Sequence, residues 1–287
     1  MFVVHDPRCA DYGSYLRPEQ PARTERSAAY LKEVHPDWTW SLPTVEVDDS
    51  TLLLAHNPAM IKRLDLPRDI DPDTPYFPEI GVHARRAVSA ALTASHHALA
   101  GRGPAFSLMR PPGHHATRDQ SMGFCYLNQI AIAVLEARRA GVGRVAVWDF
   151  DAHHGNGTEA ILLGVKEVLF TSVHQSPGYP GTGLKSLKNC LNWPVLPHFP
   201  RISHVNALRE SWDRIVAFHP DLVLVSAGFD AYSGDPITSM SLETEDFATF
   251  GTWLRAATFP SAAVLEGGYS ERLPELIDAF LSAWDAR

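Results

Sequence analysis

The chain has 287 residues, 45% of them hydrophobic and 20% charged, a composition typical of a soluble globular protein and unlike a disordered or membrane-spanning one. Its 25 Lys and Arg residues against 33 Asp and Glu residues leave a net charge of -8, which disfavours nucleic acid as a direct partner. Cys9, Cys125 and Cys190 include no C-x-x-C pair, so neither a disulfide framework nor a thiolate zinc finger is predicted. We expect a cytoplasmic protein without a membrane segment, because no apolar run approaches 18 residues and no signal peptide is visible.

Short apolar segments recur along the chain, and turns bound each of them. They are continuous and do not alternate with polar residues, as expected of strands buried on both faces of a parallel sheet. Helical patterns with apolar residues at i, i+3, i+4 and i+7 lie between several of them. In chain order, we predict strands at 2–4, 105–109, 145–148, 168–173, 222–225 and 262–265, and helices at 84–100, 127–140, 205–218 and 245–257.

This alternation of strands and helices predicts βαβ units in an α/β fold. No linker or internal repeat divides the chain, so we expect a single domain over residues 1–287. A proline-rich stretch, residues 67–78, is predicted to be a surface loop, which is a common place for substrate contacts. Ligands of parallel sheets bind at the carboxyl ends of the strands, so we expect the chemistry to follow the strands.

Carboxylates and imidazoles cluster directly after the strand predicted at 145–148. Alternate residues of an extended segment share a face, so Asp149, Asp151 and His153 can point the same way. Burying this much charge without a partner would be prohibitive, and Asp and His are ligands that divalent metals use. Asp230 follows another strand at the same edge of the sheet and is the natural third ligand of a catalytic zinc ion, beside Asp151 and His153.

Two further strand ends carry candidate catalytic groups. His114 and His115 follow the strand at 105–109, and neutral imidazoles near a metal-bound water are candidate general acids and bases. Tyr269 follows the strand at 262–265 behind two glycines, which allow a sharp turn. A phenol at that place donates a hydrogen bond to an oxyanion without adding charge.

Five motifs occur in one order along the chain: Arg110-Pro-Pro-Gly-His-His-Ala116, Gly123-Phe-Cys-Tyr-Leu-Asn128, Asp149-Phe-Asp-Ala-His-His-Gly-Asn-Gly-Thr158, Ser226-Ala-Gly-Phe-Asp230 and Glu266-Gly-Gly-Tyr269. Together they resemble the zinc-dependent histone deacetylase and acetylpolyamine amidohydrolase family, in particular its class II-like bacterial deacetylases. The resemblance implies the arginase/deacetylase fold, an eight-stranded parallel sheet with helices on both faces. It also implies hydrolysis of N-acyl amides to an amine and a carboxylate.

Residue by residue, the resemblance implies that Asp151, His153 and Asp230 bind zinc, the same three residues that the strand ends select. It implies that Tyr269 binds the substrate carbonyl oxygen opposite the zinc ion. It also implies that Gly123 offers its backbone carbonyl near the amide nitrogen.

The resemblance also outlines a substrate channel. Phe124 and Tyr179 resemble the walls of an apolar channel that admits the straight chain of an acylated lysine or polyamine. Asp73 stands near the position of an acidic residue that grips the substrate backbone. Ile237 is apolar where a polyamine-selective pocket would use an acidic residue, so we expect acyl-lysine in a protein or peptide as the substrate, with an acetylated polyamine as the alternative.

The two catalytic histidines have different expected partners. In the family, His114 is backed by the residue at position 149 and His115 by the residue at position 156, here Asp149 and Asn156. A carboxylate partner raises the pKa of an imidazole and an amide does not. We therefore predict that His114 is the more cationic and that His115 is the neutral base that later acts as an acid. His154, which follows zinc ligand His153, is expected to be hydrogen-bonded without a direct chemical role.

The resemblance gives Asp149 a second role, together with Ser172 and backbone carbonyls, around a structural K+ or Na+ ion. The chain departs from the family at Arg17-Pro18-Glu19-Gln20-Pro21-Ala22-Arg23, because the family stretch begins with histidine. An arginase-like two-metal hydrolase would need a carboxylate where this chain has Gly155. An inactive acyl-lysine binding module is disfavoured because the metal ligands and Tyr269 are all present.

Overall fold

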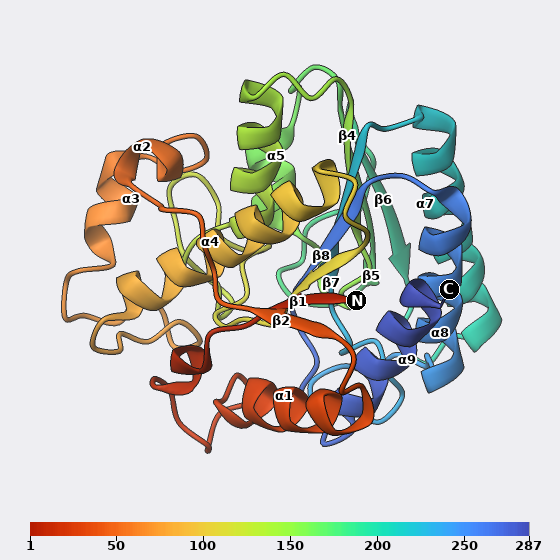
Figure 1. Cartoon of the computed structure of the whole chain (residues 1–287), viewed down its shortest axis with the longest axis horizontal. Coiled ribbons are helices and arrows are strands. Elements are labelled where there is room, and N and C mark those ends of the chain that lie inside the picture. The colour runs from red at the N-terminus through yellow and green to blue at the C-terminus, as the bar shows by residue number, and fades with distance from the viewer. Residues whose placement is uncertain (287) are drawn as a thin grey trace.

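The structure is a computed structural model, and it describes residues 1–286. Eight parallel strands form one sheet in the order β2-β1-β3-β8-β7-β4-β5-β6 (Figure 1). This confirms the α/β class and the eight-stranded parallel sheet that the resemblance implied. The strands are β1 (Phe2–Val4), β2 (Thr39–Ser41), β3 (Ala105–Ser107), β4 (Val145–Asp149), β5 (Val168–Gln175), β6 (Cys190–Val195), β7 (Leu222–Ala227) and β8 (Ser261–Leu265).

Helices cover both faces of the sheet, as predicted. One hydrophobic cluster packs the helices α2 to α6 on one face, and a second packs α1, α7, α8 and α9 on the other (Figure 1). The helices are α1 (Ala22–Val34), α2 (Asp49–Leu52), α3 (Pro58–Arg63), α4 (Ile80–Leu99), α5 (Gln129–Arg139), α6 (Asn156–Leu162), α7 (Arg201–Phe218), α8 (Thr244–Ala257) and α9 (Leu273–Asp285), and a short 3-10 helix spans Pro7–Ala10.

Strand β4 shows why the strand sequences are continuously apolar. Val145 and Val147 point into one cluster, whereas Ala146 and Trp148 point into the other. Side chains alternate between the faces of a strand, so a strand covered on both faces needs apolar residues at every position. The indole of Trp148 remains satisfied inside the core, because its N–H donates to Ser211 Oγ over 2.9 Å.

The two edge strands were not predicted from the sequence. Strand β2 has only three residues and borders solvent, and β6 contains Pro194, which lacks a backbone donor and is tolerated in a sheet only at an edge. Helices α1, α6 and α9 and the short α2 and α3 were also not predicted. The proline-rich stretch 67–78 contains no helix or strand, as expected. Within residues 1–286, no helix combines the length and apolar character needed to cross a bilayer.

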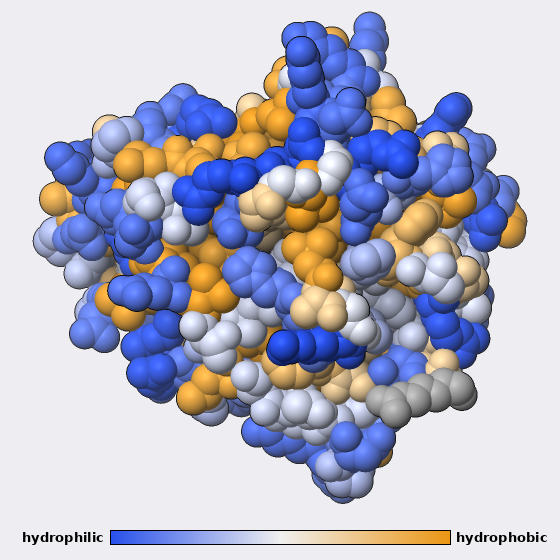
Figure 2. All heavy atoms as spheres, turned by 45° about the horizontal axis from the view of Figure 1, so that its top comes forward, coloured by the Kyte–Doolittle hydropathy of each residue, from blue (hydrophilic) through white to orange (hydrophobic). Residues whose placement is uncertain are grey.

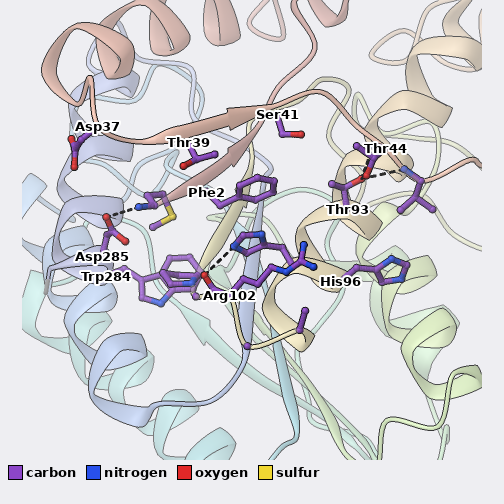
Figure 3. A pocket seen from close by; sticks show the side chains of 17 residues that line it. Phe2, Asp37, Thr39, Ser41, Thr44, Thr93, His96, Arg102, Trp284 and Asp285 are labelled. Atoms are coloured by element: carbon purple, nitrogen blue, oxygen red, sulfur yellow. Dashed lines mark hydrogen bonds and ion pairs between the residues drawn. The ribbon is translucent and has the colours of Figure 1, made fainter.

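A cavity of about 900 Å³ lies at the amino ends of the strands, beside β1 and β2, the end of α4 and the end of α9 (Figure 3). Phe2 stacks on His97 there, with ring centroids 3.9 Å apart, and Thr93 Oγ1 accepts the Thr44 backbone N–H over 2.9 Å. Figure 2 shows one face of the molecule, where hydrophilic residues alternate with smaller apolar patches. Two groups of side chains in the described part of the chain could hold a metal ion, Asp151 with His153 and Asp230, and His114 with Cys125 and Glu266, and neither group lies at this amino-end cavity.

Candidate active site

Asp151, His153 and Asp230 lie together where β4 and β7 end. One ligand atom of each residue lies within 4.8 Å of the others, and His153 Nδ1 is 2.8 Å from Asp230 Oδ2 and 3.2 Å from Asp151 Oδ1. Backbone N–H groups hold the remaining oxygens: Gly267 donates to Asp151 Oδ2 over 2.7 Å, and Ala152 donates to Asp230 Oδ1 over 2.8 Å. Each carboxylate is thereby oriented with one oxygen toward His153.

The chemistry of these three residues fits a divalent cation. Both carboxylates are 0% exposed. Burial alone would lower the pKa of His153, yet Asp230 and Asp151 outweigh it and hold that pKa well above its ordinary value. Burial, together with the charge of Asp151, raises the pKa of Asp230. Two buried carboxylates beside one imidazole are costly unless positive charge compensates them, and two oxygen donors with one nitrogen donor are a set that zinc accepts.

The two neighbouring histidines have the partners that the resemblance implied. His114 Nδ1 lies 3.0 Å from Asp149 Oδ2, and His115 Nδ1 lies 2.8 Å from Asn156 Oδ1. The two imidazole rings are 4.0 Å apart between centroids. The structure therefore places one imidazole against a carboxylate and the other against an amide.

The two pKa values depart from the ordinary value in the predicted directions, although Asp149 and Asn156 are not the largest causes. Burial would lower the pKa of His114, but the surrounding carboxylates, Asp151 first, raise it to about 10. Burial and the neighbouring imidazoles of His114 and His153 hold the pKa of His115 well below its ordinary value. At neutral pH, His114 is therefore cationic and His115 is neutral.

A cavity of about 290 Å³ leads from the protein surface to these groups. Tyr179 and Ile237 stand at its mouth with 39% and 36% of their surfaces exposed. All five predicted substrate-binding residues line it. The lining consists of Pro18, Asp73, His115, Gly123, Phe124, His153, Tyr179, Ile237 and Tyr269.

The wall at Gly123 has no room for a side chain. Its φ is 56°, in the left-handed region, and a Cβ there would lie 2.7 Å from His115 Cδ2 and 2.8 Å from Tyr179 Cε1. Phe124 follows with a φ of 67°, a conformation that is uncommon for residues other than glycine. The Phe124 backbone N–H donates to Thr74 Oγ1 over 3.3 Å, which connects this wall to the proline-rich loop.

Two buried carboxylates that the sequence analysis did not assign join the loops of the site. Glu266 Oε2 accepts the backbone N–H of Gly113 over 2.7 Å and of His114 over 3.1 Å. Asp235 Oδ2 accepts the N–H of Tyr269 over 2.8 Å, and its Oδ1 accepts the N–H of Ile237 over 3.0 Å. Glu266 begins one of the five motifs and Asp235 lies in none of them, and nothing in the sequence around either residue reveals which distant backbone groups it binds.

A third unassigned carboxylate, Glu19, joins two arginines beneath the site. Arg110 donates to Glu19 over 2.5 and 2.7 Å, and Arg23 donates to it over 3.3 Å. Arg23 also donates to Gly268 O over 2.7 Å, and its guanidinium lies 4.7 Å from the centroid of the Tyr269 ring. The N-terminal segment thus holds Tyr269 in place.

The residues expected around a monovalent cation are neighbours in the sheet. The register of β4 against β5 pairs Asp149 with Ser172, and Ser172 Oγ also lies 2.9 Å from His174 Nδ1. His154 is buried and hydrogen-bonded, with Nδ1 at 2.8 Å from Thr182 Oγ1 and Nε2 at 3.2 Å from Glu159 Oε2. These contacts fit the expectation that His154 has no direct chemical role.

The chain is similar to known proteins in both sequence and structure. The pattern of the histone deacetylase domain matches residues 17–284. A "Probable deacetylase" of Methanothermobacter thermautotrophicus is 38% identical over 256 residues, which cover 83% of this chain and 76% of that protein. "Acetylpolyamine amidohydrolase 2" of Pseudomonas aeruginosa is 32% identical over 287 residues, which cover 93% and 80%. The crystal structure of the HDA15 HD domain matches with a TM-score of 0.92 and 29% identity, covering 100% of this chain and 91% of that chain.

Proposed function

Because this chain belongs to the histone deacetylase family, we propose that it is a zinc-dependent amidohydrolase that removes an acetyl or other acyl group from the terminal amine of a straight-chain substrate. The observation that carries the proposal is the convergence of three elements on one cavity. These are the cluster of Asp151, His153 and Asp230, the pair of differently partnered histidines, and the phenol of Tyr269.

The proposed zinc site would be formed by Asp151, His153 and Asp230. Zinc held there supplies a Lewis acid that polarises the acyl carbonyl and makes a water molecule acidic. The protein then has to accept one proton, return it, and stabilise the negative charge that develops on the acyl oxygen.

We assign the transfer of this proton to His115. Its Nδ1 donates a hydrogen bond to Asn156 Oδ1, so in the neutral ring Nε2 carries a free lone pair. The low pKa keeps the ring neutral, and Nε2 accepts the proton of the attacking water. The same atom then returns the proton to the leaving amine nitrogen. Cationic His114, oriented by Asp149, contributes positive charge beside the reacting groups.

The substrate amide is oriented by two groups that line the cavity. The Tyr269 phenol donates its O–H to the acyl oxygen, and the Gly123 backbone carbonyl accepts the N–H of the amide. Phe124 and Tyr179 exclude water along the alkyl chain of the substrate. Asp149 and Ser172, adjacent across β4 and β5, are assigned to a structural K+ or Na+ ion.

Two amine classes compete as the substrate. The apolar Ile237 at the mouth supports acyl-lysine in a protein or peptide. The name of the relative from Pseudomonas aeruginosa supports an acetylated polyamine. Both substrates present the same acylated terminal amine at the end of a straight chain, so the chemistry at Tyr269 and His115 is the same for both.

The test is kcat/KM of zinc-loaded protein on an acetyl-lysine peptide, N-acetylputrescine and N-acetylspermidine, each with and without a chelator. We expect hydrolysis that the chelator abolishes. Faster turnover of the peptide identifies a lysine deacylase, and faster turnover of the amines identifies a polyamine amidohydrolase. Absence of turnover on all acylated amines, or turnover that a chelator leaves unchanged, contradicts the proposal.

A further inference from the structure

Two segments that are far apart in the sequence meet at the mouth of the cavity. Arg17 Nη1 donates to Pro72 O over 2.9 Å, and the adjacent residues Pro18 and Asp73 both line the cavity. Figure 1 shows the N-terminal loop beside the loop between α3 and α4. Arg17 replaces the histidine that begins the corresponding family stretch, so this side of the mouth carries a guanidinium and a carboxylate on neighbouring segments.

Both of these charges are available to a ligand. Arg17 is partly exposed and uses one of its five N–H donors on Pro72 O. Asp73 is exposed. Among residues 1–286, neither Arg17 nor Asp73 takes part in an ion pair. Neighbouring Asp71 instead shapes the loop, because its Oδ1 accepts the backbone N–H groups of Asp73 and Thr74 over 2.9 and 2.6 Å.

The end of the substrate opposite the acylated amine, here called the head, would lie near Arg17 and Asp73. Its own charges therefore decide how well it binds these two side chains. A guanidinium binds a carboxylate through parallel hydrogen bonds, and a carboxylate binds an ammonium group. A polyamine carries only positive charge, so it would find carboxylates at Asp71 and Asp73 but would offer the Arg17 guanidinium no anion. The backbone around a lysine within a peptide offers N–H groups to Asp73 but carries no anion, so it would leave the Arg17 guanidinium without a charged partner. A free amino acid carries one charge of each sign on a single carbon atom.

We propose that the substrate is a free N-acyl diamino acid, such as Nε-acetyl-lysine, whose α-carboxylate binds Arg17 and whose α-ammonium binds Asp73. This proposal rests on the proposed amidohydrolase function. The apolar side chains of Tyr179 and Phe124 enclose the methylene groups between the charged head and the acyl amide. The amide at the far end of the chain then reaches the catalytic groups at His115.

The test compares kcat/KM on three small substrates that differ only at the head. Nε-acetyl-lysine carries both charges, N-acetylcadaverine lacks only the carboxylate, and Nα,Nε-diacetyl-lysine lacks only the ammonium charge. We expect the protein to prefer Nε-acetyl-lysine by about tenfold or more over each of the other two, as for a charged hydrogen bond. Because the head is remote from the reacting amide, the preference should appear in KM.

Two variants assign the preference to the two charges. Arg17→Gln should bring the ratio of Nε-acetyl-lysine to N-acetylcadaverine close to one, and Asp73→Asn should do the same for the ratio to diacetyl-lysine. Arg68→Gln is the control, because it removes an exposed positive charge from the same loop outside the cavity lining, and it should keep both ratios. A variant that merely disturbs the loop would lower kcat on all three substrates together.

The outcomes separate this proposal from the amidohydrolase function. Equal kcat/KM on Nε-acetyl-lysine and N-acetylcadaverine, or a preference that persists in Arg17→Gln, overturns the head-group assignment while leaving the amidohydrolase function intact. Faster hydrolysis of an acetyl-lysine peptide or of N-acetylspermidine than of free Nε-acetyl-lysine also overturns it. Hydrolysis of none of these amides by the zinc-loaded protein overturns both proposals.

Discussion

At the carboxyl end of the sheet, Asp151 and Asp230 are completely buried beside His153, whereas at the amino end Asp37 and Arg102 are exposed to solvent beside a much larger cavity. The volumes are about 290 Å³ at the carboxyl end and about 900 Å³ at the amino end. Cavity size alone would therefore select the wrong end. Buried charge marks the other end, because desolvated carboxylates are costly unless a cation or a hydrogen-bond donor compensates them.

The parallel sheet accounts for this difference. Strands β3, β4, β7 and β8 end at one edge, so the segments that follow them bring His114, Asp151, Asp230 and Tyr269 together. The starts of the strands collect short turns whose charged groups are exposed, as at Asp37 and Arg102, or paired within the protein, as where the Met1 ammonium group binds Asp285 (Figure 3). These charges therefore carry no desolvation cost of the kind found at Asp151 and Asp230.

Removal of a metal ligand should have the largest effect. Asp230→Ala takes away one of three oriented donors, so we expect loss of bound zinc and a fall in kcat/KM of about a thousandfold or more. Metal analysis of the purified variant and turnover of an acetylated amine check this expectation. The matched control is Asp37→Ala at the amino end, which should keep both zinc and activity. Full zinc content with normal turnover in Asp230→Ala would exclude the assigned site.

Loss of the proposed base should have the next largest effect. His115→Ala removes the group that accepts the proton of water, so we expect kcat to fall by about 10²–10⁴ while bound zinc is unchanged. Retention of zinc separates this effect from that of Asp230→Ala. His97→Ala, at the amino-end cavity, is the matched control and should retain full turnover. Unchanged turnover in His115→Ala would refute the assignment of His115 as the base.

A third prediction concerns stability in acid. His56 is buried, with Nδ1 at 2.8 Å from Thr117 O and Nε2 accepting the Asn128 N–H over 2.9 Å, and burial lowers its pKa to about 4. Since the unfolded chain titrates near 6.5, this stabilisation is complete above pH 6.5 and is lost as the pH falls toward 4. We expect the free energy of unfolding to fall by about 2 kcal/mol from this group between pH 7.5 and pH 5.

Urea unfolding at the two pH values measures this effect. His56→Gln should lose less free energy of unfolding on acidification than the unsubstituted protein does. His96→Gln, which replaces an exposed histidine that pairs with Glu136, is the control for the loss of a surface imidazole, and its behaviour on acidification should stay closer to that of the unsubstituted protein than to that of His56→Gln. An acid dependence that is the same in His56→Gln and in the unsubstituted protein would show that His56 contributes nothing to it.

The smallest effect is expected at the amino-end cavity itself. Arg102→Ala removes an exposed side chain that lines this cavity, so kcat/KM and zinc content should stay within about twofold and unfolding within about 0.5 kcal/mol of the original values. Enzyme kinetics and urea unfolding check both. A large loss of turnover in Arg102→Ala would show that the amino end takes part in the chemistry.

The sequence was informative where each local segment carries its own signal. Continuous apolar residues predict the central strands, and the polar residues directly after them predict Asp151, His153 and Asp230 as neighbours. Edge strands β2 and β6 carry no such signal, because β2 has no continuous run of apolar residues and β6 contains proline. The neighbouring residues also do not indicate the role of a side chain whose binding partner is distant in the sequence.

Glu19 and Glu266 are two residues whose roles could not be predicted for this reason. Glu19 binds Arg110, which lies 91 positions away, and Glu266 binds the N–H of Gly113, which lies 153 positions away. Neither partner can be deduced from the neighbouring residues, since the contact exists only after the strands have assembled. The same holds for Arg17 and Pro72, whose contact brings together the two segments that carry Arg17 and Asp73 at the mouth of the cavity.

The most direct test of the central claim is a zinc titration of metal-stripped protein, with hydrolysis of an acetylated amine measured at each step and circular dichroism used to verify the fold. The three oriented ligands predict negligible activity without metal and a linear rise that reaches its plateau at one zinc per chain. Full activity in the metal-free protein, or no activity at any zinc content in a folded protein, would contradict the assignment of catalysis to the carboxyl end of the sheet.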